Sequence, residues 1–352
     1  MSRLDDVLDG RRVIVCCGAG GVGKTTMSAA IGLAAAQRGR RVVVVTVDPA
    51  RRLGEALGLA DGLGDDPQRL DVVAQGELWA MMLDPTMELE RVVRSHALRP
   101  GQADEALANP FTQSIGTALG GTQEYMATEV VYRLANDVRF DLVVVDTPPS
   151  DRAMEVVDAP DVLVRFLDHP VFALLMGTGG RAFRLLSAAT QPLLKAIGRV
   201  IGTAVLDDVV GFLRSFTGME ASFRDRAVAV RQLWRSDATA FVLVTAPRPD
   251  TVAETQRFGQ QLAASGIGTD LVVVNRCAPA VDIAPEPRTW APSAPGIDDV
   301  SAVRAYADWA ARLHHAESAV IEALDDPLRI DRLAGDVHDV EALVMIAEAL
   351  GG

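Results

Sequence analysis

The chain has 352 residues, of which 49% are hydrophobic and 23% charged, and its formal net charge is −13 at pH 7. This length allows two average domains or one large α/β domain with insertions, and the apolar content excludes an intrinsically disordered protein. The acidic balance argues against a nucleic-acid partner, because neutralising a phosphate backbone requires a basic face and the basic residues here are scattered.

The pattern at the beginning of the chain does not predict an export signal. Its first ten residues are polar and acidic, and no stretch of eighteen apolar residues follows anywhere. We therefore expect a cytoplasmic protein without a transmembrane segment. Cys16, Cys17 and Cys277 show no metal-binding spacing, so we expect them to be buried as small apolar side chains.

Short β-branched runs predict strands that are buried on both faces of a sheet. In chain order these runs cover residues 13–17, 41–47, 77–84, 140–146, 241–245 and 271–275. Helical patterns separate them, which predicts a doubly wound, mostly parallel α/β sheet. The proline-rich residues 277–298 should form a loop, and residues 339–350 should form a closing helix.

Two long intervals lack strand patterns and are expected to be helical. They cover residues 85–137 and 160–236, and they predict an α-helical subdomain inserted into a single-domain core of approximately residues 10–84, 138–159 and 237–352. Within the second interval, apolar residues recur at helical spacing over residues 193–213. That stretch is either a helix packed inside its own subdomain or a groove for an apolar client helix.

The most specific motif follows the first predicted strand. It runs Gly18, Ala19, Gly20, Gly21, Val22, Gly23, Lys24, Thr25, with Thr26 next, and matches the phosphate-binding pattern G-x-x-x-x-G-K-[ST]. Backbone N–H groups of such a loop surround an anion, and the following helix adds its positive end. Lys24, one of only two lysines, would reach the β- and γ-phosphates of ATP, and Thr25 would ligate Mg²⁺. The alternative is an ordinary glycine-rich turn between a strand and a helix.

Further candidates follow the carboxyl ends of other predicted strands, where nucleotides bind in open α/β sheets. Asp48 could orient or deprotonate the attacking water, or it could simply cap the next turn. Asp146 ends four apolar residues and is expected to hold Mg²⁺ directly or through water. The Thr-Pro-Pro that follows it is a candidate switch. Asn275 offers donor and acceptor edges that match adenine, and Arg276 follows it.

Taken together, these motifs resemble the ArsA family, which includes the arsenite-pump ATPase and the ATPase that targets tail-anchored membrane proteins. The matching segments are residues 18–26, 46–53, 120–127, 146–150, 247–255 and 273–276. The resemblance implies a P-loop ATPase of the deviant type related to ParA and MinD, with an inserted helical subdomain and dimers gated by nucleotide. It implies that Asp48 is the catalytic acid of switch I, that residues 146–150 form switch II, and that Asn275 contacts adenine.

Three departures from the family pattern bear on partners and cargo. Ala19 stands where the deviant loop carries a lysine that contacts nucleotide across the dimer interface. Either the chain leaves its partner's site incomplete or, as in actinobacterial-type members, it forms a heterodimer with a paralogue that supplies the lysine. The cysteines that bind metalloid in arsenite pumps are missing, as is the zinc C-x-x-C of the targeting ATPase.

The leading hypothesis is therefore a switch ATPase that hydrolyses Mg·ATP and couples its nucleotide state to an apolar client or a partner subunit. One alternative is a spatial regulator similar to ParA or MinD, although the acidic C-terminal residues lack the basic amphipathic pattern that membrane binding favours. Another alternative is the regulatory half of a heterodimeric ATPase, which binds nucleotide but hydrolyses it only weakly.

Overall fold

The computed structural model describes residues 3–48, 52–59, 62–110, 112, 121–169, 211–212, 215–280 and 300–351. Its centre is one sheet with the strand order β3-β4-β2-β5-β1-β6-β7-β8. The strands are β1 (Val13–Gly18), β2 (Arg41–Thr46), β3 (Gln68–Arg69), β4 (Glu77–Met82), β5 (Leu142–Asp146), β6 (Thr239–Thr245), β7 (Leu271–Cys277) and β8 (Leu328–Asp331). All neighbouring strands are parallel except β3 and β4.

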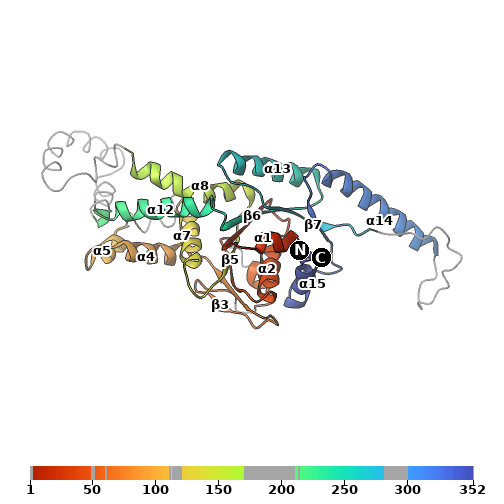
Figure 1. Ribbon diagram of the computed structural model, residues 1–352, viewed down its shortest axis with the longest axis horizontal. Helices are drawn as coiled ribbons and strands as arrows, with labels where there is room; N and C mark the ends of the chain where they lie inside the picture. The colour runs from red at the N-terminus through yellow and green to blue at the C-terminus, as the bar shows by residue number, and fades with distance from the viewer. Residues whose placement is uncertain are drawn as a thin grey trace.

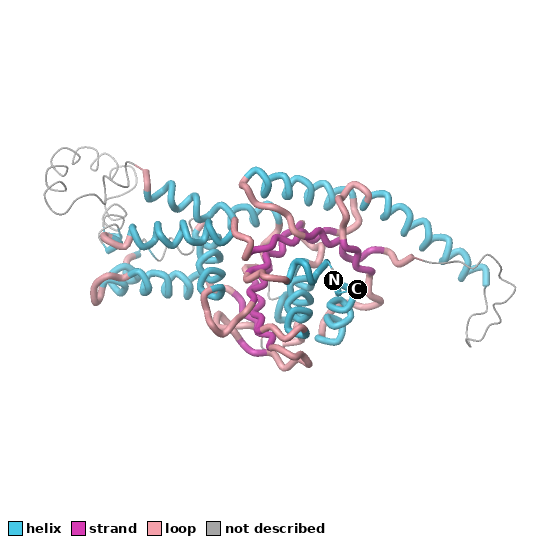
Figure 2. Tube along the Cα trace, viewed as in Figure 1, coloured by secondary structure: helices cyan, strands magenta, loops and turns pink. Residues whose placement is uncertain are grey.

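Helices cover both faces of this sheet (Figures 1 and 2). Their bounds are α1 (Arg3–Leu8), α2 (Lys24–Gln37), α3 (Arg52–Ala56), α4 (Pro85–His96), α5 (Gln102–Ala108), α7 (Thr122–Ala135), α8 (Ser150–Leu167), α12 (Glu220–Trp234), α13 (Pro249–Ala264), α14 (Val300–Ile321) and α15 (Val340–Gly351). The predicted doubly wound α/β fold is thus confirmed. The six predicted strands are present, and the two that the sequence analysis missed, β3 and β8, lie at the two edges of the sheet.

Alternation along β1 shows how the two hydrophobic cores form. Ile14 and Cys16 point into a core shared with α2 and α15, whereas Val15 and Cys17 point into a core shared with α7, α8 and α13. Successive strand side chains point to opposite faces, so a strand covered on both sides must be apolar at every position. All three cysteines are buried and free, which confirms their predicted role as small core residues.

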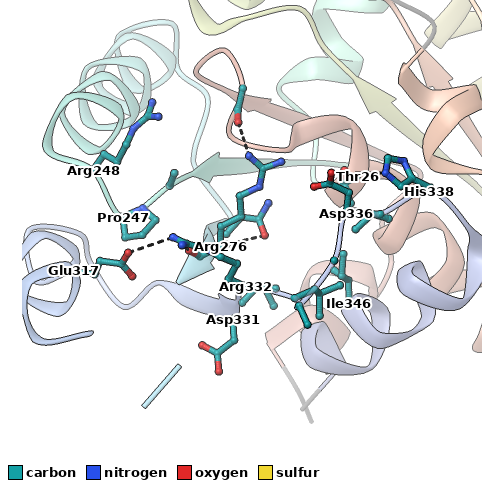
Figure 3. Close-up of a pocket in the computed structure, with 18 residues that line it drawn as sticks. Thr26, Pro247, Arg248, Arg276, Glu317, Asp331, Arg332, Asp336, His338 and Ile346 are labelled. Carbon is teal, nitrogen blue, oxygen red and sulfur yellow. Dashed lines mark hydrogen bonds and ion pairs between the residues drawn. The ribbon is translucent and has the colours of Figure 1, made fainter. Parts of the chain in front are cut away.

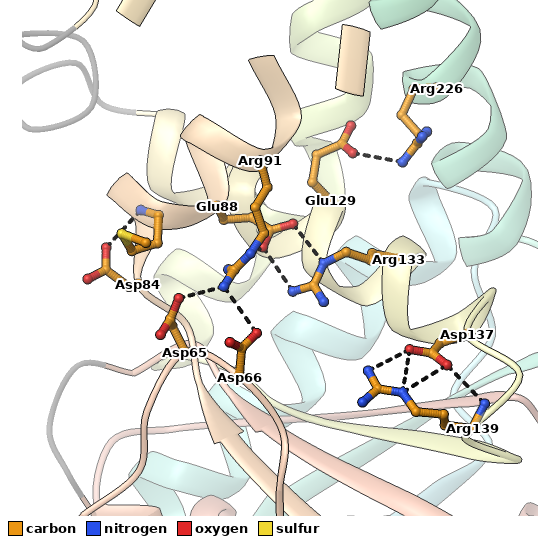
Figure 4. A network of polar contacts seen from close by, with 11 residues as sticks. Asp65, Asp66, Asp84, Glu88, Arg91, Glu129, Arg133, Asp137, Arg139 and Arg226 are labelled. Carbon is orange, nitrogen blue, oxygen red and sulfur yellow. Dashed lines mark hydrogen bonds and ion pairs between the residues drawn. The ribbon is translucent and has the colours of Figure 1, made fainter. Parts of the chain in front are cut away.

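Helices α4, α5, α8 and α12 extend away from one end of the sheet (Figure 1). Ion pairs with buried carboxylates join helices of this group to α7, as Figure 4 shows. Glu88 of α4 is 1% exposed, and its carboxylate accepts from Arg133 of α7 at 2.9 Å and from Arg91 at 3.3 Å. Glu129 of α7 likewise accepts from Arg226 of α12 at 3.1 Å. The division of the chain into a core and a helical subdomain stays a prediction, and residues 193–210 lie outside the described residues.

The C-terminal helix packs against the sheet layer. Leu343, Ile346 and Leu350 of α15 are buried in the core that α2 also lines, and both chain ends lie near each other beside α1 and α15 (Figure 1). The apolar face of α15 is therefore occupied within the fold, unlike the free membrane-binding helix that a MinD-like regulator requires. No helix in the described part of the chain combines the length and hydropathy needed to cross a bilayer.

Candidate functional site

The predicted phosphate-binding loop connects β1 to α2 at the carboxyl edge of the sheet. Gly18 has to be glycine, because a Cβ there would lie 2.0 Å from the carbonyl oxygen of Val244 on β6. Gly23 precedes the helix with φ +93°, a left-handed conformation that favours glycine. Gly21 also has a positive φ of +76°. These glycines let the chain turn sharply from the strand into the helix, as the motif requires.

Lys24 lies inside this loop rather than pointing into solvent. The side chain is only 8% exposed, and its Nζ donates a hydrogen bond to the carbonyl oxygen of Ala19 at 2.9 Å. Burial lowers the pKa of the Lys24 ammonium, and the nearby carboxylate of Asp146 opposes that shift. A compact ammonium held beside a ring of backbone amides is suited to bind phosphate oxygens.

Asp146 is the centre of the candidate magnesium site. Its Oδ2 accepts hydrogen bonds from the Thr25 hydroxyl at 2.8 Å and from the Thr46 hydroxyl at 2.9 Å. The residue is fully buried, and its Oδ1 has no hydrogen-bond partner. Burial raises the pKa of this carboxyl to about 6, while the two hydroxyls and Lys24 act in the opposite direction.

This donor set fits Mg²⁺. A buried carboxylate oxygen without a partner is costly unless a cation or a water occupies the position beside it. Mg²⁺ is commonly held by one or two protein oxygens together with waters and substrate phosphates. Thr25 and Asp146 offer that minimal set, and the described residues contain no cluster of three or more His, Cys, Asp or Glu that would hold a metal alone.

Asp48 lies just beyond the carboxyl end of β2, at the same edge of the sheet. Its backbone N–H donates to the Thr46 hydroxyl at 3.2 Å, so Thr46 contacts both the Asp48 backbone and Asp146. One carboxylate oxygen of Asp48 is 4.0 Å from the guanidinium of Arg52 in α3. The structure therefore brings Asp48 into the neighbourhood of Lys24 and Asp146, and its catalytic role stays a prediction.

The segment after Asp146 runs directly into a long helix. The Thr147 hydroxyl donates to the Cys16 carbonyl at 2.7 Å, which joins the segment to the strand that leads into the phosphate-binding loop. Ser150, the first residue of α8, donates its hydroxyl to Glu254 of α13. The helix then continues for 18 residues to Leu167 beside α12 (Figure 1). The candidate switch is therefore continuous with a helix of the extended group.

Asn275 and Arg276 donate hydrogen bonds to backbone carbonyls of the phosphate-binding loop. Asn275 is 6% exposed, and its Nδ2 donates to the Val22 carbonyl at 2.9 Å. An Arg276 guanidinium nitrogen lies 3.3 Å from the Gly21 carbonyl, to which it donates. One amide hydrogen and one oxygen lone pair of Asn275 remain available to hydrogen-bond a base. The contact of Asn275 with adenine stays a prediction.

A cavity of about 740 Å³ opens beside the loop (Figure 3). It is bordered by the loop, the ends of β6 and β7, and the segment after β8. Arg248, which also lines it, belongs to the matching segment 247–255. Lining residues that the sequence analysis did not single out include Glu317, Asp331, Arg332, Asp336 and His338. No motif marks them, because three of them follow β8, an edge strand that the sequence pattern did not predict.

Comparison with known proteins agrees with this geometry. The model of the anion-transporting ATPase family matches residues 11–288. The chain is 26% identical over 281 residues to ATPase GET3 of Malassezia globosa, covering 78% of this chain and 75% of the relative. It is 27% identical over 264 residues to ATPase get3 of Schizosaccharomyces pombe, covering 74% of this chain and 71% of the relative. These relatives are fungal and lend no support to the expected actinobacterial type.

Proposed function

Because the chain belongs to the anion-transporting ATPase family and is an ATP-hydrolysing enzyme, we propose that it works as a nucleotide-gated switch. In this proposal it hydrolyses Mg·ATP at the P-loop and couples its nucleotide state to dimer closure and to an apolar client or partner subunit. The observation that carries the proposal is the path of α8, which begins four residues after Asp146 and runs beside α12. A displacement at residues 146–150 would move the first turns of this helix directly and the part after Pro160 through the contacts with α12.

We assign a role to each group in the site from its contacts. Backbone amides of residues 19–24 and the Lys24 ammonium bind the phosphates, and the 740 Å³ cavity takes the nucleoside, with Asn275 at its border. Thr25 and Asp146 hold Mg²⁺, which supplies charge stabilisation at the transferred phosphoryl group when it is bound. Asp48 orients or deprotonates the attacking water.

The surface of α8 supports an apolar client. Val162 and Phe166 are 50% and 54% exposed, and their spacing of four residues places them on one side of the helix. Exposed apolar residues on a helix that is continuous with the candidate switch can release or bind an apolar segment as the helix moves.

A decisive test of the switch is the oligomeric state of the purified chain by analytical ultracentrifugation, with and without Mg·ADP and a γ-phosphate analogue. We expect nucleotide-dependent dimers, formed by the chain alone or with a lysine-bearing paralogue captured from native cytosol. A chain that hydrolyses ATP but stays monomeric in every nucleotide state, with no captured partner, would contradict the proposal.

Ala19 favours a second candidate, a regulatory half with weak turnover. The residue is 2% exposed, and its methyl group offers no charge to a partner's nucleotide. Single-turnover hydrolysis separates the two functions. A regulatory half binds ATP and leaves it unhydrolysed until a partner is added, whereas the switch ATPase hydrolyses it alone or as a homodimer.

A further inference from the structure

Strand β7 is irregular between Val274 and Cys277, and this part of it, which we call the Asn275–Arg276 turn, contacts the phosphate-binding loop. In this turn Arg276 has φ +63°, and it is one of two non-glycine residues with a positive φ in the described part of the chain. A left-handed conformation costs a residue with a Cβ roughly 1 kcal/mol or more, so it persists only where surrounding contacts impose it. The contacts around Arg276 therefore show which groups hold it in this conformation.

One set of contacts faces the loop. Asn275 and Arg276 donate to the carbonyls of Val22 and Gly21. In an anion-binding loop the N–H groups converge on the anion while the carbonyls turn away from it. Donors to the Gly21 and Val22 carbonyls fix the orientation of these two peptide groups, and so they fix the direction of the Val22 and Gly23 N–H groups before any phosphate arrives.

A second set of contacts fixes the turn itself. The Arg276 N–H donates to the side-chain oxygen of Asn275 at 2.9 Å, and the Arg276 carbonyl accepts from the guanidinium of Arg332 at 3.3 Å. The backbone N–H of Arg332 donates to the Cys277 carbonyl at 2.8 Å. Asn275 and Cys277 flank the left-handed residue, whereas Arg332 follows β8 and lies 56 positions away in the chain.

Helix α14 supplies the remaining contacts, to the residue that ends the turn. Glu317 accepts from the Ala278 N–H at 2.5 Å, and His314 Nδ1 lies 2.8 Å from the Ala278 carbonyl. The other carboxylate oxygen of Glu317 is 3.6 Å from the Arg332 guanidinium. Figure 3 shows Glu317, Arg332 and Arg276 in line toward the loop. Glu317 is only 7% exposed, and it contacts both the end of the turn and the arginine that holds its centre.

We propose that Glu317 is a positioning residue for nucleotide binding, acting through Ala278 and Arg332 to hold the Asn275–Arg276 turn against the phosphate-binding loop. The inference rests on the proposed function, because it assumes that the loop binds the phosphates of ATP. Glu317 itself need not touch the nucleotide. Its effect is to keep the amides of the loop preorganised, and a preorganised site binds more tightly because less ordering is required on binding.

The test compares Mg·ATP with Mg·tripolyphosphate, a probe that has phosphates but no base, by calorimetry on the full chain. We expect Glu317→Ala to raise the Kd of both ligands by about tenfold, the size expected for losing a hydrogen bond to a charged group. The rate of hydrolysis at saturating ATP should change much less than the Kd. Glu317→Gln retains an acceptor for the Ala278 N–H and should recover most of the affinity. Glu322→Ala, at an exposed position just beyond α14, is the matched control and should leave both Kd values unchanged.

Each other outcome has a definite meaning. A rise in Kd for ATP alone would show that Glu317 serves the base cavity, and unchanged affinity for both ligands would show that it has no positioning role; either result overturns the inference. If Glu317→Ala does not fold, Arg332→Ala provides the same pair of titrations with the same expectation. Failure of the unaltered chain to bind Mg·ATP would instead refute the proposed function.

Discussion

The hydroxyl of Thr25, at the start of α2, donates to the carboxylate of Asp146, at the end of β5, over 2.8 Å. The two residues are 121 positions apart in the chain. Their contact joins the phosphate-binding loop to the candidate switch, and it places a threonine hydroxyl beside the carboxylate oxygen that has no partner. This pair is the structural basis for the expected magnesium dependence.

Asp146→Asn tests the carboxylate of that pair. The amide keeps the shape of the side chain but removes the negative charge that a cation needs, so we expect hydrolysis to fall at least about hundredfold. Nucleotide affinity measured in EDTA should be little changed. Asp141→Asn is the matched control, since Asp141 precedes the same strand at its other end and forms a partly exposed ion pair with Arg41. Equal loss in both variants would remove Asp146 from its assigned role.

Lys24→Ala should abolish tight ATP binding, because the loop loses its buried ammonium while its backbone amides remain. Calorimetry with Mg·ATP measures this directly, and Lys195→Ala, at the only other lysine of the chain, serves as the control. Unchanged affinity for Mg·ATP in Lys24→Ala would contradict the assignment of this residue to the phosphates.

Asp48→Asn should leave ATP binding within about threefold of the unaltered chain but lower single-turnover hydrolysis by about 10²–10⁴-fold, the range attributed to a general base. The measurement is a single-turnover assay with enzyme in excess over ATP. An undiminished rate would leave Asp48 with only a structural role in the segment after β2.

Glu88→Ala should destabilise the fold strongly, because it removes the carboxylate that Arg133 contacts, whereas Arg91 keeps its contacts with Asp65 and Asp66. We expect a loss of about 3 kcal/mol, as for other broken buried ion pairs. Glu90→Ala is the control on the same helix: Glu90 pairs with Arg94 at the surface, where an ion pair contributes at most about 1 kcal/mol. Chemical denaturation of both variants measures the difference. A loss of similar size in both would show that the pairs drawn in Figure 4 do not stabilise the helices.

His96 should contribute to unfolding in mild acid. Burial and the nearby Arg226 lower its pKa to about 4, below the usual value of 6.5. Because the folded-state pKa is depressed, the contribution of neutral His96 is fully present above about pH 6.5 and is lost as the pH falls toward 4. Thermal unfolding from pH 7.5 to 4.5 should therefore show a smaller pH dependence in His96→Phe, which keeps the aromatic stacking on Phe223. An identical pH profile in the variant would contradict the assignment.

Much of the fold could be predicted from the sequence, because each major element depends on local chemistry. Uninterrupted β-branched runs place apolar side chains on both faces of a sheet, and both faces must then be covered. These runs therefore predicted a parallel sheet with helices on either side. The phosphate-binding loop could also be predicted, since its glycines and Lys24 are contiguous. The edge strand β8 could not, because its four residues become a strand only through pairing with β7.

The sequence by itself determined which residues stand at the carboxyl ends of the strands and enter the site. These are the loop around Lys24 and the acids Asp48 and Asp146. Only the tertiary structure decided what surrounds them. Glu317 lies 41 positions and Arg332 lies 56 positions beyond Arg276, and no local pattern connects them to it. Their contact exists because α14 and β8 return to the edge of β7, and such long-range packing depends on the whole sheet rather than on any one segment.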